Sequence, residues 1–170
     1  MLLLTAKGCL MDDFFVRFAQ TEDCLDVYEW EFDPSTRVYM QNKELVNFKS
    51  HEKWFLAAMG SASRSLLICS DKNKKKVGVL RVDYDSEMGE AALGITIAPS
   101  MRGRGYGKYC LMSSMSFILE HIATPKQFSA VVHKDNHASV KAFKSSGFTE
   151  TKNCGSSRKF LKPVDTPHGY

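Results

Sequence analysis

Three glycines at alternating positions, Gly103, Gly105 and Gly107, constrain the fold of this chain more than any other feature. They lie between a strand-like run that Pro99 ends and the longest helix-like segment, residues 106–122. Glycine accepts positive φ and leaves the backbone accessible, so several N–H groups of such a turn can converge on one anion. The following helix adds a partial positive charge at its start. Full positive charges come from three neighbouring side chains: Arg102, Arg104 and Lys108. The segment therefore predicts a phosphate or pyrophosphate site, with a plain tight turn as the alternative.

The two common nucleotide-binding motifs do not fit this turn. A Walker A loop requires GxxxxGK[ST], but its first glycine is Arg102 here and its Ser/Thr is Tyr109. A dinucleotide fingerprint requires GxGxxG, and only Gly103 and Gly105 have the right spacing, because the third glycine comes at 107. An RGG-type RNA-binding segment is also disfavoured, since the motif occurs once and in a patterned context.

Composition predicts a single globular domain and excludes several functional classes. The chain has 170 residues, of which 44% are hydrophobic and 25% are charged, enough for one sizeable core. Lys and Arg outnumber Asp and Glu by 23 to 19. This surplus is compatible with a polyanionic ligand but too small to indicate a nucleic-acid partner. The five cysteines form no CxxC pair, and their odd number argues against a disulfide framework. Three of them lie in apolar segments and are predicted to be buried thiols: Cys24, Cys69 and Cys110. Cys and His do not cluster, so no metal site is expected.

The hydropathy pattern indicates alternating strands and helices in one α/β domain. Strands are predicted at residues 14–19, 65–69, 76–84, 89–98, 128–132 and 157–161. Helices are predicted at residues 21–32, about 50–60, 106–122 and 136–146, with Thr21 and Asn136 as N-caps and Gly147 after the last helix. Lys74, Lys75 and Lys76 are interpreted as a solvated turn, with a patch for a phosphate or an anionic partner as the alternative.

No segment predicts a targeting signal or a membrane partner. The run from Met1 to Leu4 is too short for a signal peptide, and no apolar stretch could span a bilayer. We therefore expect a cytoplasmic protein. Its predicted parts are an N-terminal extension over 1–13, the α/β domain over 14–162 and a polar C-terminal tail over 163–170.

The pattern Arg102-x-x-Gly105-x-Gly107 resembles the [Q/R]xxGx[G/A] turn that binds the coenzyme A pyrophosphate in GNAT acyltransferases. Upstream, residues 89–99 resemble the fourth strand of that family. Downstream, Asn136-x-x-Ser139-x-x-x-Phe143 followed by Gly147-Phe148 resembles its last helix and closing Gly-Phe. Over residues 14–162 the chain is similar to the GNAT N-acetyltransferases. The resemblance implies the GNAT fold, a mixed and mostly antiparallel sheet of six to seven strands flanked by about four helices.

The resemblance also implies acetyl-CoA as the cofactor and assigns residues to it. The backbone of Ile95 and Ile97 would lie beside the pantetheine arm. The pyrophosphate would be bound by Arg102, Gly103, Arg104, Gly105, Tyr106, Gly107 and Lys108. Asn136, Ser139 and Phe143 would contact the cofactor from the last helix. An N-cap stabilised by about 1 kcal/mol is the alternative role of Asn136, and the two roles are compatible.

The family transfers an acetyl group directly to an amine, which needs a base, and the departing thiolate needs a proton. At the positions where the family often has a tyrosine acid and a glutamate base, this chain has Phe143 and Ala92. Glu90 lies two residues before Ala92 on the same strand face and is one candidate base. His133, which follows the fifth strand, is the other. The alternatives are an exposed strand-end carboxylate and a surface histidine.

The segment around the first two helices resembles the sugar-nucleotide N-acetyltransferases of nonulosonic acid biosynthesis, especially the pseudaminic acid branch. Matching positions occur in the expected order: Trp30, Pro34, Tyr39, Met40, His51, Trp54 and Phe55. The usual Arg-Asn is replaced by Glu31-Phe32. The acceptor contacts implied are Trp30, Arg37, Tyr39, Met40, Asn42 and His51. Their rings can stack on a uracil or a sugar, with a core role for Trp30, Trp54 and Phe55 as the alternative.

These features predict acetyl-CoA-dependent N-acetylation of an amino-sugar nucleotide of the UDP-4-amino-4,6-dideoxy type, by direct transfer in a ternary complex. The net charge of +4 favours such an anionic acceptor over a basic protein. Two alternatives stay open: an acetyltransferase for ribosomal-protein or other N-terminal amines, and a coenzyme-binding regulatory module without turnover. The expected partner is a small amine, not a nucleic acid or a membrane, and a homodimer is a candidate assembly.

Overall fold

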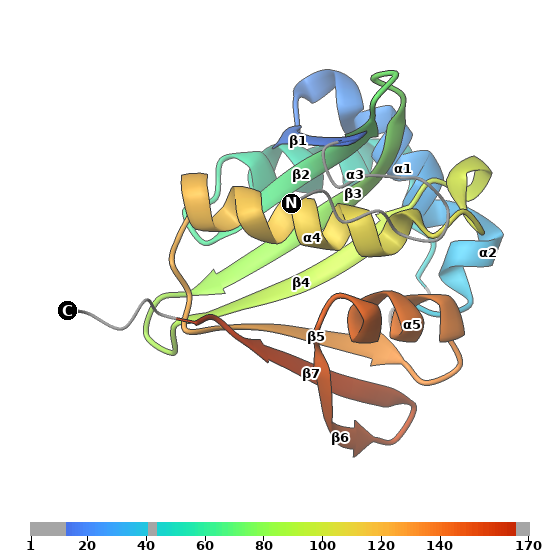
Figure 1. Cartoon of the computed structure of the whole chain (residues 1–170). Coiled ribbons are helices and arrows are strands. Elements are labelled where there is room, and N and C mark those ends of the chain that lie inside the picture. The colour runs from blue at the N-terminus through green and yellow to red at the C-terminus, as the bar shows by residue number, and fades with distance from the viewer. Residues whose placement is uncertain (1–12, 41–43, 166–170) are drawn as a thin grey trace.

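The computed structural model describes residues 13–40 and 44–165, and their centre is one seven-stranded sheet with the order β1-β2-β3-β4-β5-β7-β6 (Figure 1). The strands are β1 (Phe14–Phe18), β2 (Arg64–Asp71), β3 (Lys76–Asp85), β4 (Glu90–Ile97), β5 (Gln127–His133), β6 (Thr149–Cys154) and β7 (Ser157–Pro163). The β4–β5 pair is parallel, and the other five pairs are antiparallel. The predicted mixed, mostly antiparallel sheet is confirmed.

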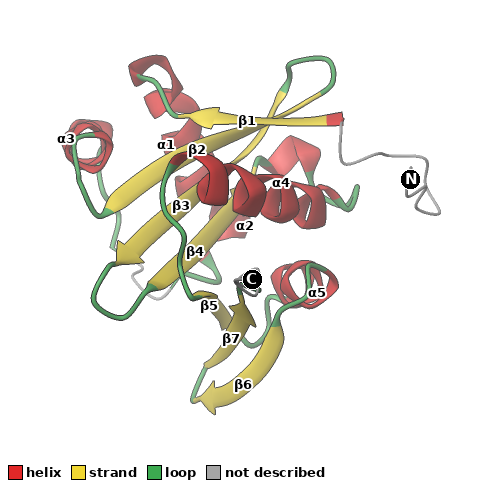
Figure 2. Ribbon diagram, turned by 60° about the vertical axis from the view of Figure 1, so that its left-hand side comes forward, coloured by secondary structure: helices red, strands yellow, loops and turns green. Residues whose placement is uncertain are grey.

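Helices cover both faces of this sheet. They are α1 (Cys24–Phe32), α2 (Pro34–Arg37), α3 (Phe48–Met59), α4 (Tyr106–His121) and α5 (His137–Ser145), with 3-10 turns at Thr21–Asp23 and Pro99–Met101. Successive residues of a strand point to opposite faces. Ile68 of β2 accordingly packs with Phe55 of α3, whereas Leu67 packs with Leu111 of α4. Figure 2 shows α3 and α4 on opposite sides of the sheet.

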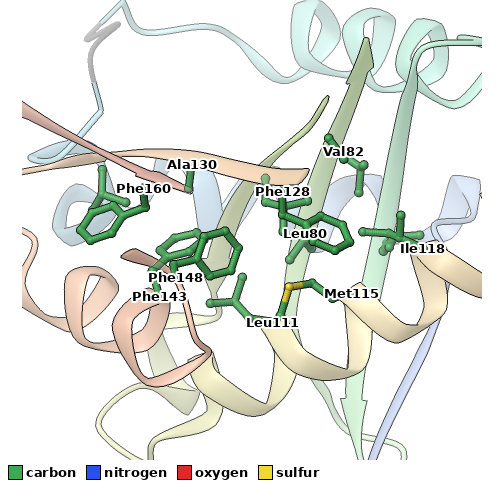
Figure 3. Close-up of a cluster of buried hydrophobic side chains, with 14 residues drawn as sticks. Leu80, Val82, Leu111, Met115, Ile118, Phe128, Ala130, Phe143, Phe148 and Phe160 are labelled. Atoms are coloured by element: carbon green, nitrogen blue, oxygen red, sulfur yellow. The ribbon is translucent and has the colours of Figure 1, made fainter. Parts of the chain in front are cut away.

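The largest hydrophobic cluster lies between the sheet and the helices α4 and α5 (Figure 3). Within it, the ring centroid of Phe143 lies 5.0 Å from that of Phe148 and 6.1 Å from that of Phe160. Burying one such side chain contributes about 1.5–3 kcal/mol. Phe143 is only 2% exposed, so the prediction that its side chain contacts the cofactor is wrong, because the ring packs in this core.

Strands β4 and β5 part after a short pairing. Their parallel register covers three residue pairs and ends at Ala92 and Ser129. From there the two strands diverge in Figure 1, while β3 remains paired with β4 as far as Ile97. At the closed end, the Glu90 carboxylate accepts hydrogen bonds from Ser129 Oγ at 2.5 Å and from Gln127 Nε2 at 2.7 Å. We call this divergence the β4–β5 fork, and Glu90 ties its closed end together.

The structure adds two elements to the predicted order and moves one cap. Helix α2 has four residues and follows Asp33, where the sequence predicted only the end of a helix. Strand β6 pairs with β7 at the edge of the sheet. It was not predicted because its sequence is polar and lacks the alternation of hydrophobic residues that indicates a strand. Thr21 is not an N-cap. Gln20 occupies that position, and its N–H donates to the Asp23 carboxylate at 2.8 Å.

Other predictions hold within the described residues. Cys24, Cys69 and Cys110 are free and buried, and Asn136 caps α5 by accepting a hydrogen bond from the Ser139 N–H. Gly147 follows α5 with a φ of +88°. The predicted N-terminal extension before residue 13 and the tail beyond residue 165 lie outside the described residues.

Lys76 is not part of a solvated turn, as the sequence suggested, but neutralises a buried carboxylate. Its Nζ lies 2.6 Å from Asp23 and 2.6 Å from Asp26. The Asp23 side chain is 1% exposed and also pairs with Arg17 at 2.7 Å. Although burial opposes ionisation, the hydrogen bonds from Arg17 and Lys76 hold the pKa of Asp23 well below its usual range. This cluster joins β1, the start of α1 and β3.

We predict that Asp23→Asn lowers the free energy of unfolding by about 3 kcal/mol at pH 7, since it removes the anion between two cations. The exposed partner offers a control: Asp26→Asn should cost about 1 kcal/mol or less. A lowered folded-state pKa stabilises the fold above the unfolded pKa, so the difference between Asp23→Asn and wild type should shrink as the pH falls below about 4. Urea unfolding at pH 7 and in acid measures this. Equal stabilities of Asp23→Asn and wild type at pH 7 would contradict the assignment.

Candidate functional site

The glycine turn before α4 leaves its backbone open. Gly103 and Gly105 have φ values of +73° and +77°, and a Cβ added to either would have no heavy atom within 4 Å. The turn leads into a 16-residue helix. The N–H groups of the first helical residues, Tyr106, Gly107 and Lys108, have no carbonyl one turn earlier to bind. Positive-φ glycines, open space and the positive end of a helix together form a suitable cradle for a diphosphate.

Gly107 has a packing role that the sequence did not indicate. A Cβ there would lie 3.2 Å from the Cβ of Ala142 on α5, so glycine permits the close approach of α4 and α5. Ser146, just after α5, donates to the Ala142 carbonyl at 2.8 Å and reaches the Lys108 carbonyl at 3.5 Å. The starting end of α4 is thereby fixed against the helix that follows β5.

The Arg102 side chain connects β4 with α2. Its Nε donates to the Ile97 carbonyl at 3.0 Å, and its Nη atoms donate to Ser35 Oγ at 2.7 Å and to Thr36 Oγ1. The donors of this guanidinium are thus directed to α2 and β4, and its assistance to the pyrophosphate stays a prediction. Arg104 is exposed and makes a contact of 3.4 Å to the Ser100 carbonyl.

The open part of the fork lies between Ile95 and Ile97 on β4 and the start of α5 after β5. Both isoleucine side chains are partly buried and pack against the hydrophobic core clusters. Asn136 and Ser139 begin α5 and are hydrogen-bonded to each other. The structure thus brings the glycine turn, the β4 edge and the start of α5 to the open side of the fork.

The two predicted bases lie far apart, because Glu90 of β4 pairs with Gln127 at the start of β5 and His133 is the last residue of β5. Hydrogen bonds, first of all from Ser129, lower the pKa of Glu90, and both its carboxylate oxygens accept hydrogen bonds. His133 lies four residues beyond Ser129, or about 13 Å along the strand, where its Nδ1 accepts from the Asp135 N–H at 3.3 Å. Its ring centroid is 6.0 Å from that of Tyr39. Because its pKa is lowered and both its oxygens accept hydrogen bonds, Glu90 is better suited to linking β4 and β5 than to acting as a base.

Glu31 is a titratable residue of this region that the sequence marked only as a departure from the usual Arg-Asn pair. It follows Val27 by four residues, so it continues the face of α1 that buries Val27 and Cys24. Burial raises the pKa of Glu31 to about 7, against the opposing effects of Arg81 and Arg37. The Arg81 guanidinium lies across Gly94, where an added Cβ would be 3.5 Å from Nη2. In the sequence, the helical spacing of Glu31 from Val27 is the signal that could have identified this residue.

The residues expected to contact the acceptor do not form one surface. His51 is 3% exposed and its ring packs against Tyr28, Phe32 and Trp54. Its predicted acceptor contact is wrong, because this ring is part of the core. Trp30 packs against two buried clusters, and Phe55 is fully buried. Met40 is partly buried.

Of the remaining acceptor candidates, Tyr39 is exposed and Arg37 is partly exposed. Tyr39 is 38% exposed beside His133. The Arg37 guanidinium lies 4.9 Å from the Phe32 ring centroid and donates to the Glu44 carbonyl at 2.6 Å. Asn42 lies outside the described residues.

An open cavity of about 560 Å³ adjoins the closed end of the fork. Its lining includes Arg64, Asp83, Glu90, Ala92 and Lys159. Asp83 pairs across the strands with Ala92, two residues from the Arg81–Gly94 pair, so the cavity lies on the same sheet face as Arg81. Within residues 13–40 and 44–165 no cluster of three or more metal-ligating side chains is found, nor a helix that could cross a membrane.

Comparisons with known proteins agree with this geometry. Residues 13–149 match the family model described as "Acetyltransferase (GNAT) domain". The spermidine N-acetyltransferase from Vibrio cholerae in complex with CoA and spermine has a TM-score of 0.79 at 13% identity, over 89% of this chain and 96% of that one.

Two other solved structures are similarly close. AAC(6')-Ib in complex with ribostamycin and coenzyme A has a TM-score of 0.78 at 12% identity, over 89% of this chain and 94% of that one. A domain from Methanocaldococcus jannaschii has a TM-score of 0.75 at 21% identity, over 89% and 98%. The search of curated protein sequences gave no match. At these identities the solved structures share the fold with this chain.

Proposed function

Because the chain belongs to the acetyltransferase (GNAT) family, and is therefore an N-acetyltransferase that uses acetyl-CoA, we propose that it acetylates the primary amine of a small molecule. The observation that carries the proposal is the β4–β5 fork with the open glycine turn beside it. The acceptor that we propose is an amino-sugar nucleotide of the UDP-4-amino-4,6-dideoxy type, in the nonulosonate pathway of surface glycans.

The proposed cofactor site uses mainly backbone groups. The turn from Gly103 to Lys108 supplies N–H groups for the pyrophosphate, and the exposed Arg104 adds positive charge. The β4 edge at Ile95 and Ile97 would bind the amide-bearing pantetheine arm as it would bind another strand. Asn136 and Ser139 would flank the arm from α5. The bound cofactor supplies the acetyl thioester, and Arg102 fixes α2 beside the cofactor site.

We predict that Gly103→Ala and Gly105→Ala each weaken coenzyme A binding about tenfold or more. A methyl group there meets an unfavourable positive φ and occupies the space beside the N–H groups. Isothermal titration calorimetry measures the affinity. Gly60→Ala is the matched control, since Gly60 caps α3 with a φ of −88° and has room for a Cβ. Unchanged affinity in both turn variants would contradict this site.

The acceptor proposal rests on charge and on residues 29–55. Arg37 and Arg81 lie on the α1 side of the fork, and Arg64 and Lys159 line the adjoining cavity. Guanidinium groups bind diphosphates well, and Tyr39 offers an accessible ring next to His133. The acceptor contacts proposed are therefore Arg37, Tyr39, Met40 and Asn42, without His51 and Trp30.

A small cationic amine is the second candidate acceptor. The similar solved structures include a spermidine N-acetyltransferase with spermine and AAC(6')-Ib with ribostamycin. The cavity also has acidic lining residues, Asp83, Asp85 and Glu90, which would attract such an amine. N-terminal amines of proteins and a regulatory role without turnover are the further alternatives.

Thiol release from acetyl-CoA, followed in parallel with four acceptors, tests the proposal. They are a UDP-4-amino-4,6-dideoxy sugar, spermidine, ribostamycin and a peptide with a free N-terminus. We expect kcat/KM to be at least tenfold higher with the sugar nucleotide. Preference for spermidine or ribostamycin would favour the cationic acceptor, and preference for the peptide would favour a protein substrate. Coenzyme A binding without turnover on any acceptor would indicate the regulatory role.

A further inference from the structure

We infer that the side chains of Tyr39 and His133 meet across the open end of the β4–β5 fork and bind the pantetheine arm of the cofactor there. The inference rests on the proposed function, because it takes that arm to lie in the fork. For Tyr39 it adds a contact with the cofactor to the acceptor contact proposed above. For His133 it replaces the role of a base with that of a cofactor-binding residue.

The first argument is the face of the sheet to which His133 points. Val132 is buried in the cluster under α4, and successive residues of a strand point to opposite faces. His133 therefore points to the face that α1 and α3 cover. On the other arm, Thr96 of β4 points to this same face, since it pairs with Val79, which packs under α3.

The second argument is that Tyr39 is held to the β4 arm. Arg102 donates to the Ile97 carbonyl, at the end of β4, at 3.0 Å. The same guanidinium donates to Ser35 Oγ at 2.7 Å and to Thr36 Oγ1, both of α2. Tyr39 follows this helix, and its N–H donates to the Thr36 carbonyl at 3.2 Å. The position of Tyr39 is thus set from the β4 side of the fork.

The third argument is the contact between the two rings. The ring centroids of Tyr39 and His133 are 6.0 Å apart, with the planes inclined at 49°, which is within the range of about 4.5–7 Å for interacting rings. His133 is the last residue of β5, and the pairing of β4 with β5 has already ended at Ala92 and Ser129. The contact therefore joins the two arms of the fork where their backbones are not paired.

Both rings keep surface and polar groups for a ligand. Tyr39 is 38% exposed and the His133 side chain is 23% exposed. His133 Nδ1 accepts a hydrogen bond from the Asp135 N–H at 3.3 Å, so the neutral ring has its proton on Nε2. Among residues 13–40 and 44–165, no hydrogen bond to this Nε2 is found.

This chemistry matches the pantetheine arm. The arm contains two amides and a carbon with two methyl groups. An amide carbonyl can accept a hydrogen bond from Nε2 of His133, and the methyl groups can pack on the ring of Tyr39. The nucleotide part of the cofactor, by contrast, is assigned to the glycine turn. The inference therefore predicts that the two rings act on the arm and not on the nucleotide.

The test compares coenzyme A with adenosine 3′-phosphate 5′-diphosphate, which is coenzyme A without its pantetheine arm, by isothermal titration calorimetry. Tyr39→Ala and His133→Ala should each weaken coenzyme A binding about fivefold and leave the affinity for the nucleotide unchanged. Tyr39→Phe keeps the ring and should bind coenzyme A as wild type does. Because the two side chains act together, the double alanine variant should bind about as weakly as either single variant.

Phe15→Ala is the matched control. Phe15 is an aromatic residue with 57% exposure on β1, at the far edge of the sheet, and its replacement should change neither affinity. Unchanged coenzyme A affinity in both Tyr39→Ala and His133→Ala would overturn the inference, even if the enzyme acetylates its acceptor. Equal losses for coenzyme A and the nucleotide would also overturn it, since the effect would not come from the arm. No binding of coenzyme A to the wild-type protein would overturn the proposed function itself.

Discussion

The limited pairing of β4 with β5 is the constraint on which the rest of the structure depends. Eight residue pairs join β4 to β3 and seven join β5 to β7, but only three join β4 to β5. Each arm of the fork is held by its outer neighbour, and Glu90 ties the two arms where they meet. Backbone groups on the inner edges then need another partner. The topology itself therefore leaves open strand edges that can pair with another amide-bearing chain. The pantetheine arm of the cofactor is such a chain.

The helices set the two sides of this site. Gly107 lets α4 approach Ala142 of α5. The glycine turn at the start of α4 is therefore held close to the helix that follows β5. Arg102 links the end of β4 to Ser35 and Thr36, which fixes α2 relative to β4. Gly107 and Arg102 thus fix the helices around the turn, while Gly103 and Gly105 keep the turn itself open.

Much of the fold, and the open glycine turn in it, could be predicted from the sequence because those features are local. The glycine turn, the strand before it and the helix after it are contiguous, and α5 has its own cap at Asn136. What failed depended on contacts between distant segments. Lys76 was read as solvated because its partner Asp23 precedes a helix far away in the sequence. The acceptor role of His51 comes from a family resemblance, and its burial could not be predicted because its aromatic neighbours Tyr28 and Phe32 belong to another helix.

Glu31 shows the same difficulty at the site. A glutamate within a helix is usually exposed, and only its spacing from Val27 indicates that it continues a buried face. Its raised pKa depends on the surrounding fold, which its own helix does not reveal. The binding of the cofactor by the fork and the glycine turn can be tested by hydrogen–deuterium exchange with and without coenzyme A. We predict slower exchange at residues 93–97 and 103–108 when coenzyme A is bound, with α3 unchanged. Protection confined to other segments would contradict it.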